Sequence, residues 1–135
     1  MNVILCLDDR DGMLFNHRRQ SRDRTVLEDI FQNLGERQLL IRPFSLSLFR
    51  EHGNRVRVEE TLLENAEPED YCFVEDLPLA PWKDKIRSIT VYRWNRHYPA
   101  DVSLDLDLKT GWRLVSQQDF PGYSHDTITK EVYEP

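Results

Sequence analysis

The chain has 135 residues, a size typical of one hydrophobic core, so we expect a single domain spanning residues 1–135. Hydrophobic residues make up 39% of the chain, and no stretch free of Asp, Glu, Lys and Arg exceeds seven residues. A membrane helix needs about 18 or more consecutive apolar residues, so the sequence excludes membrane spans and a membrane partner. The first residues have no basic leader and run into carboxylates at Asp8, which predicts a cytoplasmic protein.

The net charge of −6 argues against broad affinity for nucleic acid or anionic membranes. Positive charge is nevertheless concentrated in one segment, because Asn16–Arg24 holds four Arg and one Asp. The two cysteines, Cys6 and Cys72, sit in apolar runs and lack the spacing of a zinc or redox site. We therefore expect both to be buried free thiols.

The first half of the chain alternates strand and helix patterns. Asn2–Leu7 is an apolar run that stops at carboxylates, as a buried strand does at a sheet edge. A helix is predicted over Arg22–Leu34, with Ser21 as N-cap and Gly35 after its end, because five apolar residues recur at helical spacing. Shorter elements follow: a strand at Gln38–Ile41, a helix from Ser45 to Gly53, a strand at Val56–Val58, a helical turn at Thr61–Asn65 and a strand at Tyr71–Val74.

The second half of the chain is rich in strands. Ile86–Trp94 and Leu104–Leu108 alternate apolar and polar residues. Trp112–Phe120 and His125–Tyr133 flank the turn residues 121–124, which predicts a closing antiparallel hairpin. The expected fold class is α/β, with a mixed, mainly parallel sheet, flanking helices and a C-terminal antiparallel hairpin.

Several strings of the chain resemble those of one known enzyme family. Gly12-Met13 and Asn16 resemble its G-M/I-x-x-N loop, and the segments IRSITVYRWNRHYPADVSLDLDL and WRLVSQQDFPGYSHDTITKEVY resemble its late strand, acidic segment and closing hairpin. The resemblance implies a dihydrofolate reductase-like fold over most of the chain. It also implies that the helix after Ser21 corresponds to the one that carries the substrate carboxylate, for which Asp23 is the nearest match.

The motifs that hold NADPH in that family are missing. Its G-R-x-T turn, which offers backbone and an Arg to the phosphates, is replaced by Arg42-Pro43-Phe44-Ser45. Its Gly-Gly is replaced by Glu75-Asp76, two carboxylates that would repel a pyrophosphate. We therefore expect the scaffold without its redox cofactor, and no other cofactor in its place.

The sequence is also similar to a family of small bacterial proteins often labelled ribonuclease Z. That chemistry requires an HxHxDH cluster that holds two zinc ions close together. The four histidines of this chain lie far apart in sequence, so we expect no dinuclear hydrolase and no metal site. Asp105 and Asp107 share one face of the predicted strand, and we interpret them as an exposed polar face rather than a cation site.

Two basic clusters are candidate ligand-binding sites. In the first, Arg18 and Arg19, with Asn16 in the same loop, could clamp a phosphate or carboxylate at a helix N-terminus. The alternatives are a solvated loop, or pairing with Asp8, Asp9 and Asp11. Asp23 is either a substrate anchor or a partner of the helix dipole.

The second cluster combines Arg93, Asn95 and Arg96 with aromatic residues, and could stack on a base or grip an acidic partner. It could equally be a strand end where Trp94 packs and the arginines balance Asp101. Ser124, His125 and Asp126 are sequence neighbours beside the predicted hairpin turn, and adjacency alone cannot form a nucleophile triad. Ser124 and Asp126 are interpreted as turn residues.

Together these patterns predict a protein that binds an anionic small molecule or a macromolecular partner, such as a protein, without NADPH. The alternative is an enzyme: either a divergent reductase in which Asp23 anchors a heterocyclic substrate, or an RNA-processing protein that uses the two basic clusters. RNA binding is possible but is not favoured by the net charge.

Overall fold

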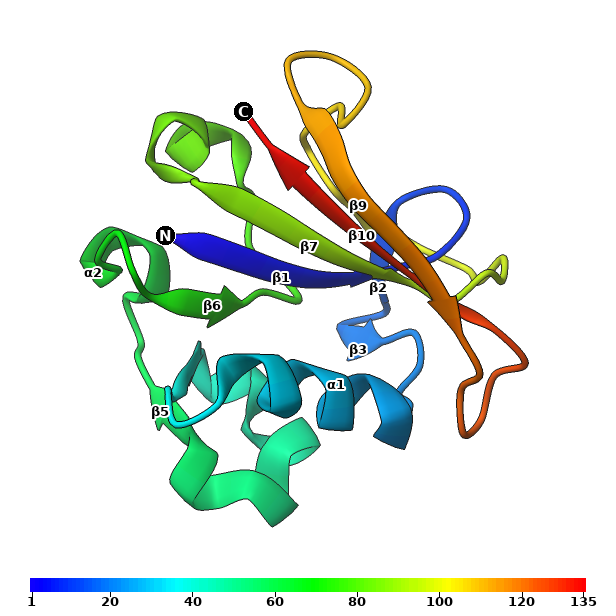
Figure 1. The fold of residues 1–135 in the computed structure, drawn as a ribbon, viewed down its shortest axis with the longest axis horizontal. Coiled ribbons are helices and arrows are strands. Elements are labelled where there is room, and N and C mark those ends of the chain that lie inside the picture. Colours follow the sequence, from blue (N-terminus) through cyan, green and yellow to red (C-terminus); the bar gives the residue numbers. More distant parts are fainter.

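The computed structural model describes all 135 residues, and a seven-stranded sheet in the order β5-β4-β6-β1-β7-β10-β9 runs through it (Figure 1). The strands from β5 to β7 run parallel, whereas β10 is antiparallel to both β7 and β9. The mainly parallel sheet and the C-terminal hairpin predicted from the sequence are confirmed. The strands are β1 (Asn2–Leu7), β4 (Leu39–Ile41), β5 (Val56–Val58), β6 (Tyr71–Phe73), β7 (Ser88–Arg93), β9 (Arg113–Phe120) and β10 (Ile128–Glu134).

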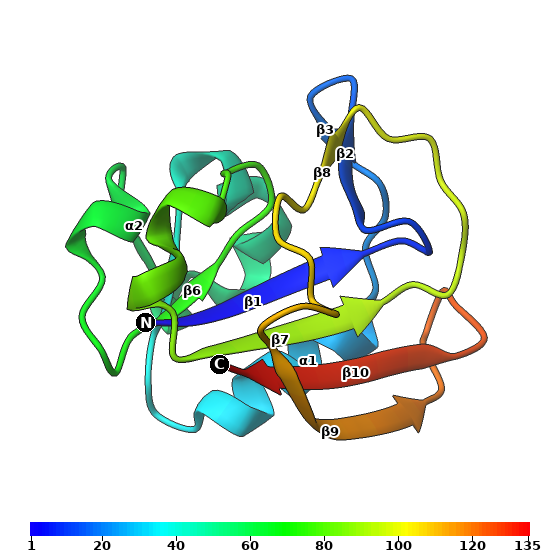
Figure 2. The ribbon, with the colours of Figure 1, turned by 90° about the horizontal axis from the view of Figure 1, so that it is seen from above.

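Helical segments cover both faces of this sheet (Figures 1 and 2). The helix α1 (Arg24–Leu34) and the 3-10 segment η1 (Pro43–Arg55) pack on one face. The short helix α2 (Leu62–Asn65) and the 3-10 segment η2 (Ala80–Lys85) lie on the other face. Strand β1 lies between β6 and β7 and is apolar on both sides, as expected for a strand covered on both faces.

The helix α1 is held by an apolar stripe and by caps at both ends. Its buried residues are the five predicted from the spacing: Val26, Leu27, Ile30, Phe31 and Leu34. The N-cap is Asp23 rather than Ser21, because the Asp23 carboxylate accepts a hydrogen bond from Thr25 N–H at 2.9 Å. At the other end Gly35 takes φ 62°, and its N–H donates to the Phe31 carbonyl.

A second sheet of three short strands stands at the carboxyl end of β1 (Figure 2). It comprises β2 (Gly12–Phe15), β3 (Arg18–Arg19) and β8 (Val102–Ser103). Asn16 and His17 join β2 to β3 with φ values of 53° and 61°, the two positive values of a tight hairpin turn. The segment that resembles the G-M/I-x-x-N loop therefore forms a small hairpin.

The predicted strand over Leu104–Leu108 is wrong. The segment forms turns in which Leu106 and Leu108 are buried, while Asp105 and Asp107 bind backbone N–H groups. Apolar alternation arises here because two turns in succession each bury one leucine. No three His, Cys, Asp or Glu side chains come together as metal ligands.

Other expectations hold in part. The segment predicted as a helix from Ser45 to Gly53 is 3-10, with non-helical backbone at Phe49 and His52. Cys6 and Cys72 are free thiols, as predicted; Cys72 is buried and Cys6 half-buried. None of the helices combines the length and the apolar character that a bilayer span requires.

Candidate functional site

Two adjoining hollows lie where α1 begins, at the carboxyl ends of β1 and β6. The inner cavity has a volume of about 20 Å³, room for about one water molecule. Its floor is mainly apolar and comes from β1, α1, η1 and the ends of β6 and β7: Cys6, Val26, Leu27, Leu48, Phe73 and Trp94. Ser21 and Asp23 also line it.

A wider polar groove of about 750 Å³ opens outside this cavity. It runs between the start of α1, the middle of η1 and the turn that joins β9 to β10. Charged side chains dominate its walls: Arg22, Arg24, Glu28, Arg50 and Glu51. Arg19, Asp23 and Leu27 line both hollows, so the cavity opens toward the groove at these residues.

Arg19 forms one wall of the cavity through an ion pair with Glu75. Its Nε lies 2.7 Å from Glu75 Oε1 and its Nη2 lies 3.1 Å from Oε2, so the contact is bidentate. The hydroxyl of Ser45 donates a further hydrogen bond to Glu75, at 2.7 Å. Arg42 and Asp76 make a second bidentate pair nearby. Arg19 and Arg42 are therefore balanced by the carboxylates of the Glu75-Asp76 step.

The other arginines near the groove have no ion-pair partner. Arg22, Arg24 and Arg50 are exposed, and none of them lies within ion-pair distance of a carboxylate. Arg24 instead stacks over the ring of Tyr123, 4.3 Å from its centroid. Arg18, predicted as a ligand contact, is exposed and unpaired too, but it does not line either hollow.

Asp23 joins the start of α1 to the turn between β9 and β10. Besides Thr25 N–H, its carboxylate accepts hydrogen bonds from the backbone N–H groups of Tyr123 (2.9 Å) and Ser124 (2.8 Å) and from His125 Nδ1 (2.9 Å). Burial raises the pKa of this carboxyl, but the bonds from His125 and the three N–H groups outweigh it and lower the pKa to about 2. Asp23 is therefore a buried carboxylate that is ionised at neutral pH.

His125 lies beneath this turn with both ring nitrogens engaged. Its Nε2 lies 3.0 Å from Ser21 Oγ and 3.1 Å from the Tyr98 hydroxyl. The imidazole stacks on the indole of Trp94, with ring centroids 4.7 Å apart. The sequence analysis treated His125 only with its neighbours Ser124 and Asp126, because no local pattern reports contacts across about 100 residues.

Asp8 organises the loops beyond β1 and connects them to the first basic cluster. Its carboxylate accepts from the N–H groups of Arg10 (2.8 Å) and Gly12 (2.7 Å) and from Gln20 Nε2 (2.9 Å). Burial raises its pKa, and these hydrogen bonds bring the pKa below its ordinary value. Asn16 contributes as a turn residue, and its N–H donates to Asp101.

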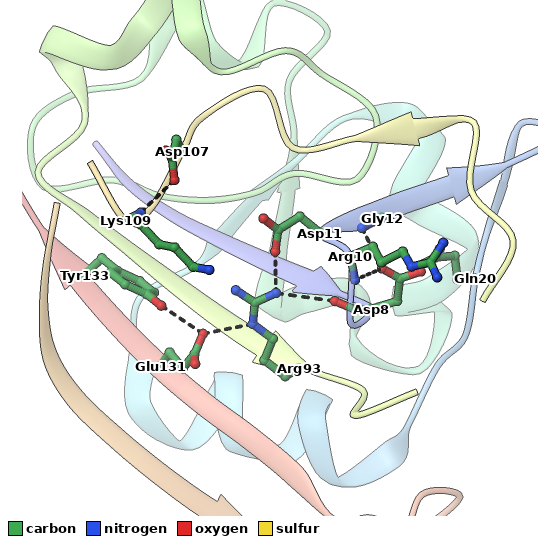
Figure 3. A network of polar contacts seen from close by, with 10 residues as sticks. All are labelled: Asp8, Arg10, Asp11, Gly12, Gln20, Arg93, Asp107, Lys109, Glu131 and Tyr133. Carbon is green, nitrogen blue, oxygen red and sulfur yellow. Dashed lines mark hydrogen bonds and ion pairs between the residues drawn. The ribbon is translucent and has the colours of Figure 1, made fainter. Parts of the chain in front are cut away.

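The second basic cluster, Arg93, Asn95 and Arg96, lines neither hollow. Figure 3 shows Arg93 between Asp11 and Glu131, with a further bond to the Asp8 carbonyl. Burial lowers the pKa of this guanidinium, but Asp11 and Glu131 raise the pKa by a larger amount, so Arg93 stays charged. Asn95 donates to Thr127 O and Thr129 Oγ1, and Arg96 is an exposed cation without an ion pair.

Comparison with solved structures identifies the architecture. A dihydrofolate reductase from Enterococcus faecalis, described as complexed with NADP(H) and RAB-propyl, superposes with a TM-score of 0.66 over 98% of this chain and 94% of that chain. The fold is that of the dihydrofolate reductases. Sequence identity is 10%, so the likeness extends to the fold alone. No protein-family model matches the chain, and no curated protein matches it. Nothing in these comparisons supports the ribonuclease Z label.

The resemblance to the dihydrofolate reductases implies a dinucleotide-binding site at the ends of β4 and β6. The residues at these two strand ends show whether a pyrophosphate could bind there. At the end of β4, Pro43 has no N–H to offer, and the guanidinium of Arg42 is bound to Asp76. Beyond β6, the N–H groups of Leu79 and Ala80 donate to the carboxylate of Asp105, at 2.8 and 3.0 Å. The guanidinium of Arg42 and the N–H groups of Leu79 and Ala80 are thus bound to carboxylates of the chain itself.

Proposed function

We propose that the groove beside α1 binds an anionic small molecule, and that it does so without a dinucleotide. The observation that carries this proposal is the group of three exposed arginines, Arg22, Arg24 and Arg50, which surround one groove without ion-pair partners. Surface arginines with nearby carboxylates commonly pair with them, as Arg57 does with Glu59.

The local charge supports an anion. Asp23 is bound to His125 and Arg19 is balanced by Glu75, which leaves three arginines facing Glu28 and Glu51 across the groove. A positive excess in a chain of net charge −6 attracts small anions, and guanidinium groups bind carboxylates and phosphates in bidentate fashion. The apolar cavity next to the groove offers a seat for a small uncharged group.

The residues at the implied dinucleotide-binding site do not fit NADPH. A pyrophosphate needs free N–H donors and positive charge, whereas this edge presents Pro43, the bound pair of Arg42 and Asp76, and N–H groups already satisfied by Asp105. The proposed ligand therefore occupies only the side of the scaffold next to α1.

Calorimetric titration with small anions tests this proposal. The probes are inorganic phosphate, citrate and 4-hydroxybenzoate, each titrated over a series of salt concentrations. We expect binding of at least one probe, with an affinity that falls as salt rises. The double variant Arg22→Ala/Arg24→Ala should weaken that binding about 10-fold or more, by loss of two charged contacts. Arg113→Ala, which removes an exposed charge on β9, is the matched control.

Two results would contradict the proposal. One is an unchanged affinity in the Arg22→Ala/Arg24→Ala variant, and the other is the absence of binding for every probe. A short RNA that binds in a salt-dependent way while no small anion does would instead support the RNA-binding alternative.

A further inference from the structure

Three residues with complementary chemistry converge beside the inner cavity, which Ser21 and Asp23 line. Ser21 Oγ lies 3.0 Å from His125 Nε2, and His125 Nδ1 lies 2.9 Å from Asp23 Oδ2. A hydroxyl, an imidazole and a carboxylate in this order and at these distances are the parts of an activated nucleophile. Ser21 and Asp23 come from the segment before α1, whereas His125 comes from the turn between β9 and β10.

The hydrogen bonds determine which nitrogen of His125 carries the proton. Asp23 is ionised and can only accept, so the contact at 2.9 Å requires a proton on Nδ1. When the ring carries only this proton, Nε2 is an acceptor that faces the hydroxyls of Ser21 and Tyr98. This is the tautomer that a general base needs in order to take a proton from Ser21.

The surroundings hold the imidazole in place and leave the hydroxyl accessible. The side chain of His125 is 3% exposed and stacks on Trp94, whereas Ser21 is half-buried and lines the cavity. The backbone N–H of Arg22, the residue after Ser21, donates to no group of the chain. It can therefore donate to an oxygen that becomes negative when Ser21 is attacking a carbonyl carbon.

We propose that Ser21 is the nucleophile of an acyl-transfer reaction, with His125 as general base and Asp23 as the residue that positions His125. The substrate class is an ester of a short acyl group with an alcohol portion that carries a negative charge. The mainly apolar lining of the cavity beside Ser21 suits an apolar acyl group, and the charged lining of the groove suits the anionic portion. The choice of an anionic ester rests on the proposed function, whereas the assignment of Ser21 as the nucleophile does not.

The reaction balances with water as the second substrate. Ser21 Oγ forms a bond to the carbonyl carbon as its proton passes to His125 Nε2. The bond from that carbon to the alcohol oxygen then breaks, and the departing oxygen takes the proton from Nε2. Water repeats both steps on the acyl-serine, which releases the carboxylic acid and restores Ser21.

Covalent labelling with a fluorophosphonate probe tests the nucleophile directly. An activated serine displaces fluoride and keeps the phosphonyl group, and mass spectrometry of the digested protein identifies the labelled residue. We expect a single label on Ser21, which is absent from Ser21→Ala and present in Ser124→Ala. Ser124 is a matched control because it lies next to His125 and its hydroxyl makes no hydrogen bond. Thermal melting of each variant confirms that it is folded.

Ester hydrolysis separates this inference from the proposed function. Wild-type protein should hydrolyse 4-nitrophenyl acetate and 4-acetoxybenzoate, with kcat/KM falling about 1,000-fold or more in Ser21→Ala. Preference for the charged ester that disappears in Arg22→Ala/Arg24→Ala supports both proposals. Hydrolysis of both esters without such a preference upholds the nucleophile and overturns the anionic substrate. No label, or a label on Tyr98 or another residue in place of Ser21, overturns the nucleophile itself.

Discussion

Asp23 is the side chain at which the start of α1 and the turn between β9 and β10 meet. Its two oxygens satisfy three backbone N–H groups and one imidazole, and its side chain has no exposed surface. Asn at this position keeps the size but removes the charge and turns an NH₂ group toward donors. We expect Asp23→Asn to lower the free energy of unfolding by about 2–4 kcal/mol in urea titrations. Asp126→Asn, at an exposed position of the same turn, should change it by less than about 0.5 kcal/mol; equal effects would contradict this assignment.

The same carboxyl gives the stability a defined pH dependence. Burial raises its pKa, but the bonds from His125 and the backbone lower it to about 2, from an ordinary value of 3.8. Because the pKa is lower in the folded state, the contribution is complete above about pH 5 and is lost as the pH falls toward 2. It amounts to about 2 kcal/mol. Urea titrations of wild type and Asp23→Asn should show a smaller difference in the free energy of unfolding at pH 3 than at pH 6. An equal difference at both pH values would exclude Asp23 as the source of the pH dependence.

At the scale of elements, the turn between β9 and β10 must lie close against the start of α1 (Figure 1). Gly122 makes this contact possible, since a Cβ there would lie 2.6 Å from the His125 carbonyl oxygen and 2.8 Å from Asp23 Oδ2. We expect Gly122→Ala to destabilise the protein by about 1–3 kcal/mol in thermal or urea unfolding. Gly53→Ala is the control, because a Cβ at Gly53 meets nothing within 4 Å. Equal melting temperatures for the two variants would mean that the turn adjusts without cost.

Local patterns predicted the elements whose residues follow one period. The helical spacing of Val26 to Leu34 and the turn between two strand-like runs gave α1 and the closing hairpin nearly as observed. The alternation from Leu104 to Leu108 led to the wrong prediction of a strand, because buried residues alternate in turns as well as in strands. The N-cap was misplaced by two residues, since Ser21 and Asp23 are both good caps and only the distance to Thr25 N–H distinguishes them.

The candidate site was less predictable than the fold. The sequence drew attention to Asp23 and to the arginine segment, because charge and helix position are local properties. It could not indicate that Glu75 binds Arg19 across 56 positions, or that His125 meets Ser21 across 104. Such contacts depend on the strand order of the sheet, which brings β10 next to β7 and its preceding turn over α1.

For the whole molecule, the central expectation is a reductase scaffold that binds no nicotinamide dinucleotide. Calorimetric titration with NADPH should give no binding at micromolar concentrations, because Asp105 holds the N–H groups of Leu79 and Ala80 and Asp76 holds the guanidinium of Arg42. A dihydrofolate reductase titrated under the same conditions serves as the positive control. A dissociation constant in the micromolar range for this chain would show that NADPH displaces the carboxylates of Asp76 and Asp105 from the groups that they bind.

The position of β10 has a consequence for how the protein folds during its synthesis. Although it is the last strand in chain order, it lies inside the sheet, between β7 and β9. A nascent chain on the ribosome therefore exposes the unpaired edge of β7 until β10 emerges, and an open edge of this kind invites pairing with other chains. His125 lies just before β10 and emerges with it. The contact between Ser21 and His125 therefore forms only when the hairpin of β9 and β10 joins the sheet.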